Sequence, residues 1–417
     1  MKNRNLILAL FFILLAAIGI STGFFLAKGK STAPTEAEAD PRQINAVSKK
    51  LDTLNITVDP RIELLTAVQQ QSDYKVLTNF DFTYKAAMEE YFQGYRKHDA
   101  IKSFNKLKNL GFNYDAPPET MLFLSNPPNL TENLEITEDL ILRATDKNKL
   151  SEFIEALRDF SKDSDFQKFY FQNIPFYQTM IDKVYQDTKD MKLIEELNSY
   201  YAMDANSYTL ILSPMLHNGG YGPGITTKDG LDIYGIIGPD SVMEEKSGTL
   251  LPTYSIEGIR HIVWHEFSHS FVNPLTKKYL DEVNKCDKLY SYIERRMNKQ
   301  AYVNWETCVN EHIIRAVTAR LTYLNLGKGA GDSMIANERA NAFYYVPALC
   351  DSLEFYEGHR DTYPTFESYY PELIKVFKKL SDQELPDEFF LNDFTGPINS
   401  AFNYFAFWQI KHTREVI

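Results

Sequence analysis

The chain has 417 residues, a formal net charge of −12 at pH 7 and an aromatic content of 14%. A chain of this length and apolar content can bury a sizeable core, as one large domain or as two lobes. The negative charge argues against nucleic acid and against an anionic membrane surface as partners. The three cysteines, Cys286, Cys308 and Cys350, form no Cys-x-x-Cys pair, so we expect buried thiols and no cysteine-based zinc site.

The first 30 residues form a hydrophobic segment that begins with positive side chains. Lys2 and Arg4 precede an apolar run over residues 6–27, and a run of about 22 residues is long enough to span a bilayer. Residues 1–30 are therefore predicted to be a transmembrane anchor or a cleaved signal peptide. Either one places the remainder outside the cytoplasm, in the cell envelope or secreted. Residues 31–45, rich in small, proline and acidic residues, are predicted to be a linker.

Residues 46–200 are predicted to form a mainly helical lobe. A short strand over 55–58 precedes an amphipathic helix that opens with Asp59 and Pro60, a capping residue and a proline suited to a first turn. The proline pairs at 117–118 and 127–128 indicate loops. Further helices are expected at 86–97, 98–110, 150–160, 166–187 with a break at Pro175, and 190–200.

The region 201–417 is predicted to begin with a small sheet and to continue as helices, which gives an α+β fold dominated by helices. Segments 207–213 and 231–237 are rich in β-branched and aromatic residues and are predicted to be strands. The glycine-rich segment 218–224 between them is compatible with an ordinary hairpin loop. The other interpretation is that an edge strand at this place can pair with an extended peptide.

The stretch 264–269 reads Trp-His-Glu-Phe-Ser-His and lies in a helix predicted over 255–273, which the following proline should end. Because His265 and His269 are four residues apart, they share one face of a helix and can converge on one cation. Glu266 projects about 100° away, beside that cation and outside its ligands. Two neutral imidazoles and an adjacent carboxylate fit a site where Zn²⁺ activates water and Glu266 is the general base.

The alternative interpretation is that these three side chains lie on a solvated helix face. That alternative fits poorly, because an apolar stripe at helical spacing leaves little of this helix facing water. Buried histidines and carboxylates need partners, and one metal ion would satisfy all three. The stripe consists of Ile256, Ile259, Val263 and Phe267.

A zinc site with two histidines needs a third protein ligand. The next clear helix, predicted over 305–326 and ended by Gly327, carries Glu306, Glu311 and His312. Glu306 lies about 140° round the helix from Glu311, so only one of the two can face a given metal. His312 points about 100° away from Glu311 and would give a three-histidine site. Spacing alone leaves these alternatives open.

The pair Asn310-Glu311, which follows the His-Glu-x-x-His motif on the next major helix, resembles the glutamate-zincin metallopeptidases. In that family the glutamate of such a pair is the third zinc ligand. The resemblance implies a zincin-like catalytic core in which His265, His269 and Glu311 hold Zn²⁺ and Glu266 is the general base.

The resemblance extends over about residues 206–326 and departs from the better-known branch of the family at Ile314-Arg315, where that branch has a Ser-Asp pair. The aspartate that orients a ligand histidine must therefore come from elsewhere or be absent. The exported portion also resembles a bacterial family of exported metallopeptidases that pairs an Arg-x-Glu-Leu segment, here residues 61–64, with a His-Glu-Phe-x-His motif. That likeness implies an extracytoplasmic hydrolase.

Residues 332–417 are expected to add helices with many aromatic side chains. Zinc peptidases place a Tyr, His or Arg opposite the general base, where it stabilises the oxyanion. Tyr345, His359 and Arg360 are candidates for this role, although aromatic residues at such density commonly form a core.

The sequence therefore predicts an exported zinc-dependent hydrolase, with a peptide or protein as its substrate and Zn²⁺ as its cofactor. Two other interpretations stay open. The first is a binding or scaffolding protein of the cell envelope that retains a structural or vestigial zinc site. The second is a metal-dependent hydrolase of non-protein amide substrates. All three share the metal ligands, so the motifs do not separate them.

Overall fold

The computed structural model describes residues 44–72, 74–385 and 387–390. These described residues all belong to one compact unit. The predicted anchor or signal peptide at 1–30 lies outside the described residues, as does nearly all of the linker predicted at 31–45. Among the described residues, no helix has both the length and the apolar character needed to cross a membrane.

A mixed sheet of six strands contains strands from both predicted regions of the chain, residues 46–200 and residues 201–417. β1 (Val47–Leu51) and β2 (Leu54–Val58) form an antiparallel hairpin. β2 pairs in parallel with β3 (Ser207–Leu212), which pairs in parallel with β6 (Gly230–Ile237). Because β2 comes from the first region and β3 from the second, the sheet is continuous across the boundary between the two regions. In spatial order the strands are β1 (Val47–Leu51), β2 (Leu54–Val58), β3 (Ser207–Leu212), β6 (Gly230–Ile237) and β4 (Gly220–Tyr221), and β5 (Gly224–Thr227) also pairs with β6.

Most of the helices predicted for residues 46–200 are present, and the break predicted at Pro175 falls at Asn173, two residues earlier. The proline pair at 117–118 does not mark a loop, because both residues lie in the first turn of α4 (Ala116–Leu122), where no intrahelical N–H bond is lost. β1 and the helix α5 (Glu138–Arg143) were not predicted from the sequence. The helices of this part are α1 (Pro60–Gln71), α2 (Thr83–Phe92), α3 (Asp99–Lys108), α4 (Ala116–Leu122), α5 (Glu138–Arg143), α6 (Lys147–Asp163), α7 (Phe166–Gln172), α8 (Ile174–Thr188) and α9 (Leu193–Tyr201).

The helix that contains the His-Glu-x-x-His motif is longer than predicted. α10 (Ile256–Lys278) continues through Pro274 for four more residues. Bonds to other elements fix this last turn, because the hydroxyl of Thr276 donates to Asn310 Oδ1 and lies 2.5 Å from the hydroxyl of Tyr370. These bonds offset the backbone bond that the proline removes.

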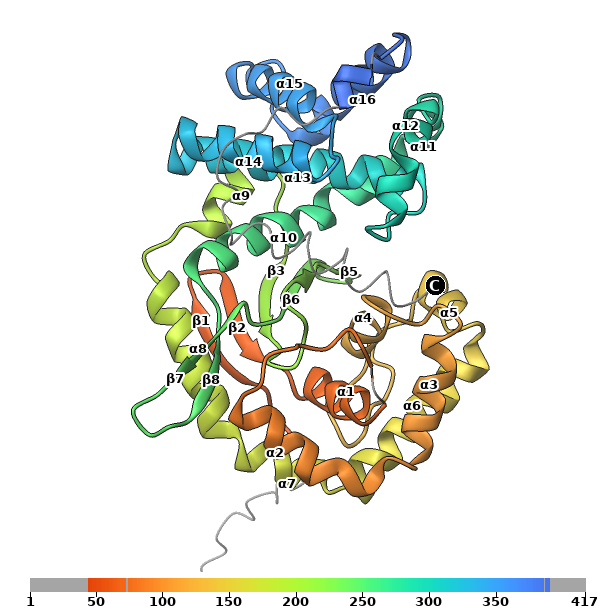
Figure 1. The fold of residues 1–417 in the computed structure, drawn as a ribbon, viewed down its shortest axis with the longest axis vertical. Coiled ribbons are helices and arrows are strands. Elements are labelled where there is room, and N and C mark those ends of the chain that lie inside the picture. Colours follow the sequence, from red (N-terminus) through yellow and green to blue (C-terminus); the bar gives the residue numbers. More distant parts are fainter. Residues whose placement is uncertain (1–43, 73, 386, 391–417) are drawn as a thin grey trace, which may run out of the picture. The chain divides into compact units, whose positions relative to one another are not determined.

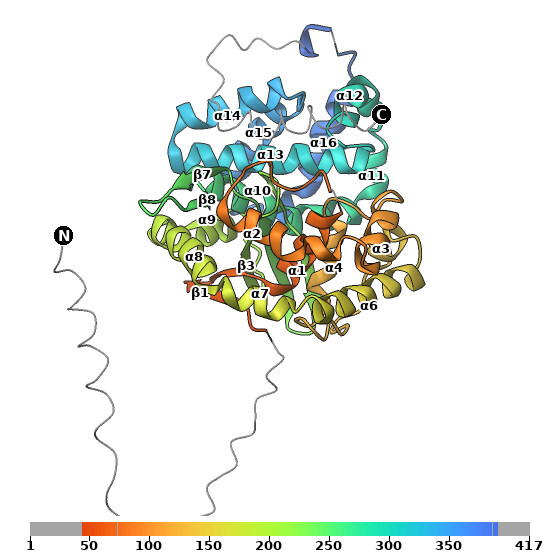
Figure 2. The same cartoon turned by 60° about the horizontal axis from the view of Figure 1, so that its bottom comes forward.

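Helix α13 (Trp305–Leu326) has the bounds that the sequence predicted, and Gly327 caps it. In Figure 1, α10 lies between the sheet and α13. Figure 2 shows α13 and α14 running side by side. The remaining elements are a hairpin of β7 (Ser241–Glu244) and β8 (Leu250–Thr253), the helices α11 (Leu280–Asn284), α12 (Lys288–Asn298), α14 (Lys328–Ala340), α15 (Val346–Gly358) and α16 (Phe366–Ser381), and the short 3-10 helices at Gln93–Tyr95 and Asp387–Phe390.

Candidate metal centre

The N-terminus of α10 is fixed by a capping network, which sets the position of the motif further along the helix. The side chain of Ser255 accepts a hydrogen bond from the backbone N–H of Gly258. Asp240 Oδ2 in turn accepts hydrogen bonds from the N–H and the hydroxyl of Ser255. Such caps satisfy backbone donors that the first turn of a helix leaves free.

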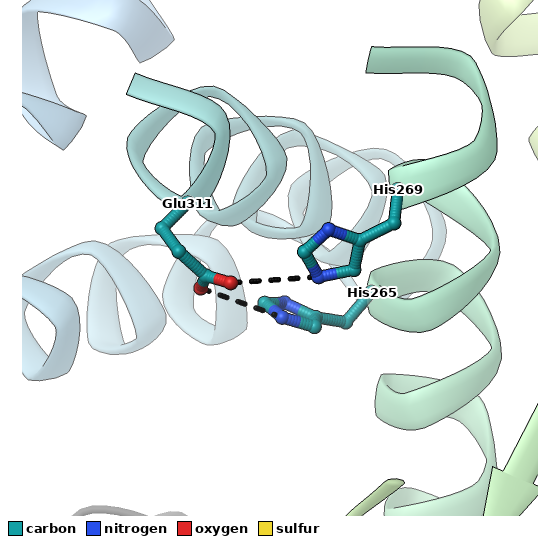
Figure 3. A group of neighbouring side chains, drawn as sticks. All are labelled: His265, His269 and Glu311. Atoms are coloured by element: carbon teal, nitrogen blue, oxygen red, sulfur yellow. Dashed lines mark ion pairs between the residues drawn. The ribbon is translucent and has the colours of Figure 1, made fainter. Parts of the chain in front are cut away.

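His265, His269 and Glu311 come together between α10 and α13 (Figure 3). Nε2 of His265 lies 3.6 Å from Glu311 Oε2, and Nε2 of His269 lies 3.4 Å from Glu311 Oε1. Ligand atoms of a tetrahedral zinc ion, at bond lengths of about 2.0–2.1 Å, are about 3.3 Å apart. These three side chains could therefore hold one metal ion, and the structure brings together the three ligands that the resemblance implied.

The protonation of the histidines suits metal binding. Burial and the nearby charge of Arg315 hold the pKa of His265 well below its ordinary value, so its imidazole is neutral at pH 7 and has a lone pair to offer. Nδ1 of His269 lies 3.3 Å from Asn273 Oδ1, which can accept a hydrogen bond from the Nδ1–H tautomer and so leave Nε2 free for a cation.

Glu266 lies beside the three donors. Its Oε2 is 4.0 Å from His269 Nε2. Burial, more than any neighbouring charge, raises the pKa of Glu266 to about 7. A carboxyl group with this pKa can both accept and release a proton near neutral pH.

The edge of the sheet touches the residue expected to be the general base. A Cβ at Gly220 would lie 3.3 Å from Glu266 Cγ, and a Cβ at Gly222 would lie 1.9 Å from the Glu266 carbonyl oxygen. Any larger residue at position 222 would therefore displace the backbone. The glycine-rich segment 218–224 includes β4 and the first residue of β5, and both strands pair with β6 and contact α10.

The structure places the two competing ligands away from the cluster. Nδ1 of His312 lies 2.7 Å from the carbonyl oxygen of Cys308, and its ring packs against Phe343 and Tyr345. Burial raises the pKa of the Tyr370 phenol, and the charge of Glu306 adds to this rise. Within the described ranges, the one group of His, Cys, Asp or Glu side chains placed to hold a metal ion contains Glu311 and neither alternative.

The three residues considered for oxyanion stabilisation are engaged elsewhere. The hydroxyl of Tyr345 donates to the carbonyl of Leu289 at 2.7 Å. Arg360 donates to the carbonyl of Tyr200 at 2.8 Å, and Nδ1 of His359 lies 2.7 Å from the carbonyl oxygen of Phe355. None of these contacts brings them to the metal cluster.

Arg315 and the glycines at 220 and 222 are the residues at this site that the sequence analysis missed. Nε of Arg315 donates to Glu311 Oε2 at 3.1 Å. The spacing of four residues on one helix could have indicated this pair. The glycines carried no comparable signal, because their contact with Glu266 joins segments more than forty residues apart in the sequence.

An α+β protein with two histidines and a glutamate in metal-binding positions is the class that the fold and the cluster define. The chain belongs to the family described as domain of unknown function (DUF4932), which matches residues 54–376. The matched range includes the main sheet from β2 onward and all three candidate ligands. Comparisons with curated proteins and with solved structures find no match.

Proposed function

We propose that this protein is a zinc-dependent hydrolase that cleaves peptide bonds and has a zincin-like core. The observation that carries the proposal is the convergence of His265, His269 and Glu311, with the carboxylate of Glu266 4.0 Å from His269 Nε2. Two imidazoles and one carboxylate are the ligand set of several catalytic zinc sites.

The type and number of donors favour zinc in a catalytic site. Nitrogen ligands from histidine suit Zn²⁺ better than Mg²⁺ or Ca²⁺, which prefer oxygen. A structural zinc site usually has four protein ligands, whereas a catalytic site has three and leaves a position for water or substrate. The cluster has three.

In this proposal each side chain has a defined task. His265, His269 and Glu311 bind the ion, which when bound polarises the substrate carbonyl and makes water more acidic. Glu266 takes a proton from water on its carboxylate as the water oxygen attacks the amide carbon. It then passes this proton to the nitrogen of the leaving amine.

The position of β4 favours a peptide over other amide substrates. β4 is an edge strand that pairs on one side with β6, and its Gly220, together with Gly222 just after the strand, lies against Glu266. An edge strand offers unpaired backbone groups to an extended peptide. This observation supports a peptidase more than the alternatives of a scaffolding protein with a vestigial zinc site or a hydrolase of non-protein amides.

Hydrolysis of a mixed peptide pool, followed by mass spectrometry, tests the proposal. The zinc-loaded protein should produce cleaved peptides, and Glu266→Gln should abolish cleavage while keeping its zinc, because Glu266 is beside the donors and not one of them. Zinc binding without cleavage of any peptide would support the scaffolding alternative. Loss of zinc in Glu266→Gln would contradict the role given to Glu266.

We also propose an extracytoplasmic location, which rests on the hydrophobic run at residues 6–27. Cell fractionation with protease protection tests it, since the folded part should be accessible from outside the cytoplasmic membrane. Recovery of an intact N-terminus in the cytosol would overturn this part of the proposal.

A further inference from the structure

Arg315 is held by four groups directly behind Glu311. Its Nε donates to Glu311 Oε2 at 3.1 Å, its Nη1 to Glu338 Oε2 at 2.8 Å, and its Nη2 to the hydroxyl of Tyr302 at 3.3 Å. The guanidinium lies over the ring of Phe343, 3.9 Å from its centroid. Three hydrogen bonds in different directions and the stacking on Phe343 together hold the guanidinium of Arg315 in one position.

The two carboxylates beside Arg315 carry more negative charge than its guanidinium can neutralise. The side chains of Glu311 and Glu338 are each 7% exposed, and that of Arg315 is 16% exposed. One guanidinium between two buried carboxylates leaves one negative charge uncompensated. Because Glu338 makes the shorter contact with Arg315, the charge of Glu311 remains available to a cation at the cluster.

The support that many zinc sites give to a ligand histidine is absent at His265. Metal-binding histidines usually donate their second N–H to a carboxylate or carbonyl. Nδ1 of His265 is buried and has no hydrogen-bond partner among the described residues. At this site the ligand with a charged hydrogen-bond partner is Glu311, and the partner is Arg315. Ile314 and Arg315 occupy the positions at which the better-known branch of the glutamate-zincins has a Ser-Asp pair.

We infer that Arg315 is a positioning residue, which fixes the carboxylate of Glu311 for metal binding, and that Glu338 supplies its counter-charge. Without Arg315 the carboxylate could rotate about its terminal bond, and the donor geometry would have to form on binding. This inference rests on the proposed function, because it assumes that the cluster binds zinc.

The same helix contains a matched control. Arg320 donates to Glu357 at 2.9 Å through Nε and at 2.5 Å through Nη2, and it also lies over an aromatic ring, that of Tyr323. Its side chain is 7% exposed. This second Arg-Glu pair contacts none of the three candidate ligands. Its removal therefore measures how the loss of such a pair from α13 affects the protein when the metal cluster is not touched.

The test compares two charge-neutral double variants, Arg315→Met/Glu338→Gln and Arg320→Met/Glu357→Gln, with the wild type. Zinc affinity is measured by competition with a chelator, and the visible spectrum of the Co²⁺-loaded protein reports the ligand geometry. We expect the first variant to bind zinc about 10–100-fold more weakly, as for other partners of metal ligands, and to have an altered Co²⁺ spectrum. The second variant should match the wild type in both measurements, even if both variants unfold at a lower temperature.

A conservative variant keeps the inference testable if the first double variant does not fold. Arg315→Lys retains the charge but has one ammonium in place of a fork of donors. Its zinc affinity should fall below that of the wild type. Wild-type affinity and an unchanged Co²⁺ spectrum in both Arg315 variants would overturn the positioning role while leaving the zinc site intact. A wild-type protein that binds no zinc would overturn the proposed function itself.

Discussion

Gly222 and Glu266 are in such close contact that a Cβ on Gly222 would lie 1.9 Å from the Glu266 carbonyl oxygen and 2.5 Å from its carbonyl carbon. The atoms in contact belong to helix backbone, which cannot move aside as the end of a flexible side chain can. This contact fixes the distance between the edge of the sheet and the helix that carries the candidate metal ligands.

Replacing Gly222 with alanine should push the segment 220–224 away from α10. We expect a loss of about 1–3 kcal/mol in the free energy of unfolding, as for other overpacked sites, together with a fall in peptide hydrolysis. Gly329→Ala is the control, since nothing lies within 4 Å of a Cβ there and α14 contains the residue. That change should be neutral or stabilise by up to about 1 kcal/mol. Equal urea midpoints for both variants would contradict the close contact.

Glu63 should make the stability of the protein decrease as pH rises. Its side chain is fully buried in α1 and accepts a hydrogen bond from the hydroxyl of Tyr84. Burial raises the pKa of Glu63 to about 8, from an ordinary value of 4.5. Between these two values the folded state holds a proton that the unfolded state has lost. Stability is therefore fully present below the unfolded pKa and is lost as pH rises through the folded pKa.

The Glu63→Gln variant removes this titration while keeping the shape of the side chain. Urea unfolding at pH 5 and pH 8 should show the wild type losing up to about 1.4 kcal/mol per pH unit relative to the variant. Parallel pH dependence of the two proteins would show that Glu63 is ionised in the folded state at neutral pH.

Thr276 should contribute to stability through its contacts with other helices. Its hydroxyl donates to Asn310 and lies 2.5 Å from the hydroxyl of Tyr370. Thr276→Val leaves these buried groups without a partner and should cost about 1–3 kcal/mol. The control Thr318→Val removes a hydroxyl whose bond among the described residues goes to the Ile314 carbonyl of its own helix, so its cost should be smaller. If both valine variants unfold at the same urea concentration, the contacts of Thr276 do not anchor the end of α10.

The ligand assignment predicts different results for three residues of α13. Glu311→Gln should lower zinc affinity by orders of magnitude, because it removes a charged ligand from the cluster. Glu306→Gln and His312→Ala should largely retain the affinity, since His312 packs among aromatic rings and Glu306 is not part of the cluster. Competition with a chelator on the folded proteins measures all three. Loss of zinc in Glu306→Gln alone would move the third ligand to the first turn of the helix.

Local patterns predicted the parts of the site that lie on single helices. The spacing of His265 and His269 gave their shared face, and the bounds of α13 followed from its apolar pattern and Gly327. The continuation of α10 past Pro274 did not follow, because it depends on bonds from Thr276 to side chains far away in the sequence.

The relations between elements were not readable from the sequence. In the sequence, Arg315 was only a departure from the Ser-Asp pair of the glutamate-zincins. The positioning role that we infer for it depends on its contact with Glu338 on α14, which the sequence did not indicate. β1 was missed because its sequence, Val-Ser-Lys-Lys-Leu, is short and half polar, and pairing with β2 decides its conformation.

The most direct test of the central claim is the zinc content of the folded protein after removal of metal and reconstitution with Zn²⁺, measured by elemental analysis. The account predicts about one zinc per wild-type chain, and far less for His265→Ala, His269→Ala and Glu311→Gln, because these residues supply the donors of the cluster. A folded wild-type protein without zinc, or full zinc content in all three variants, would contradict it.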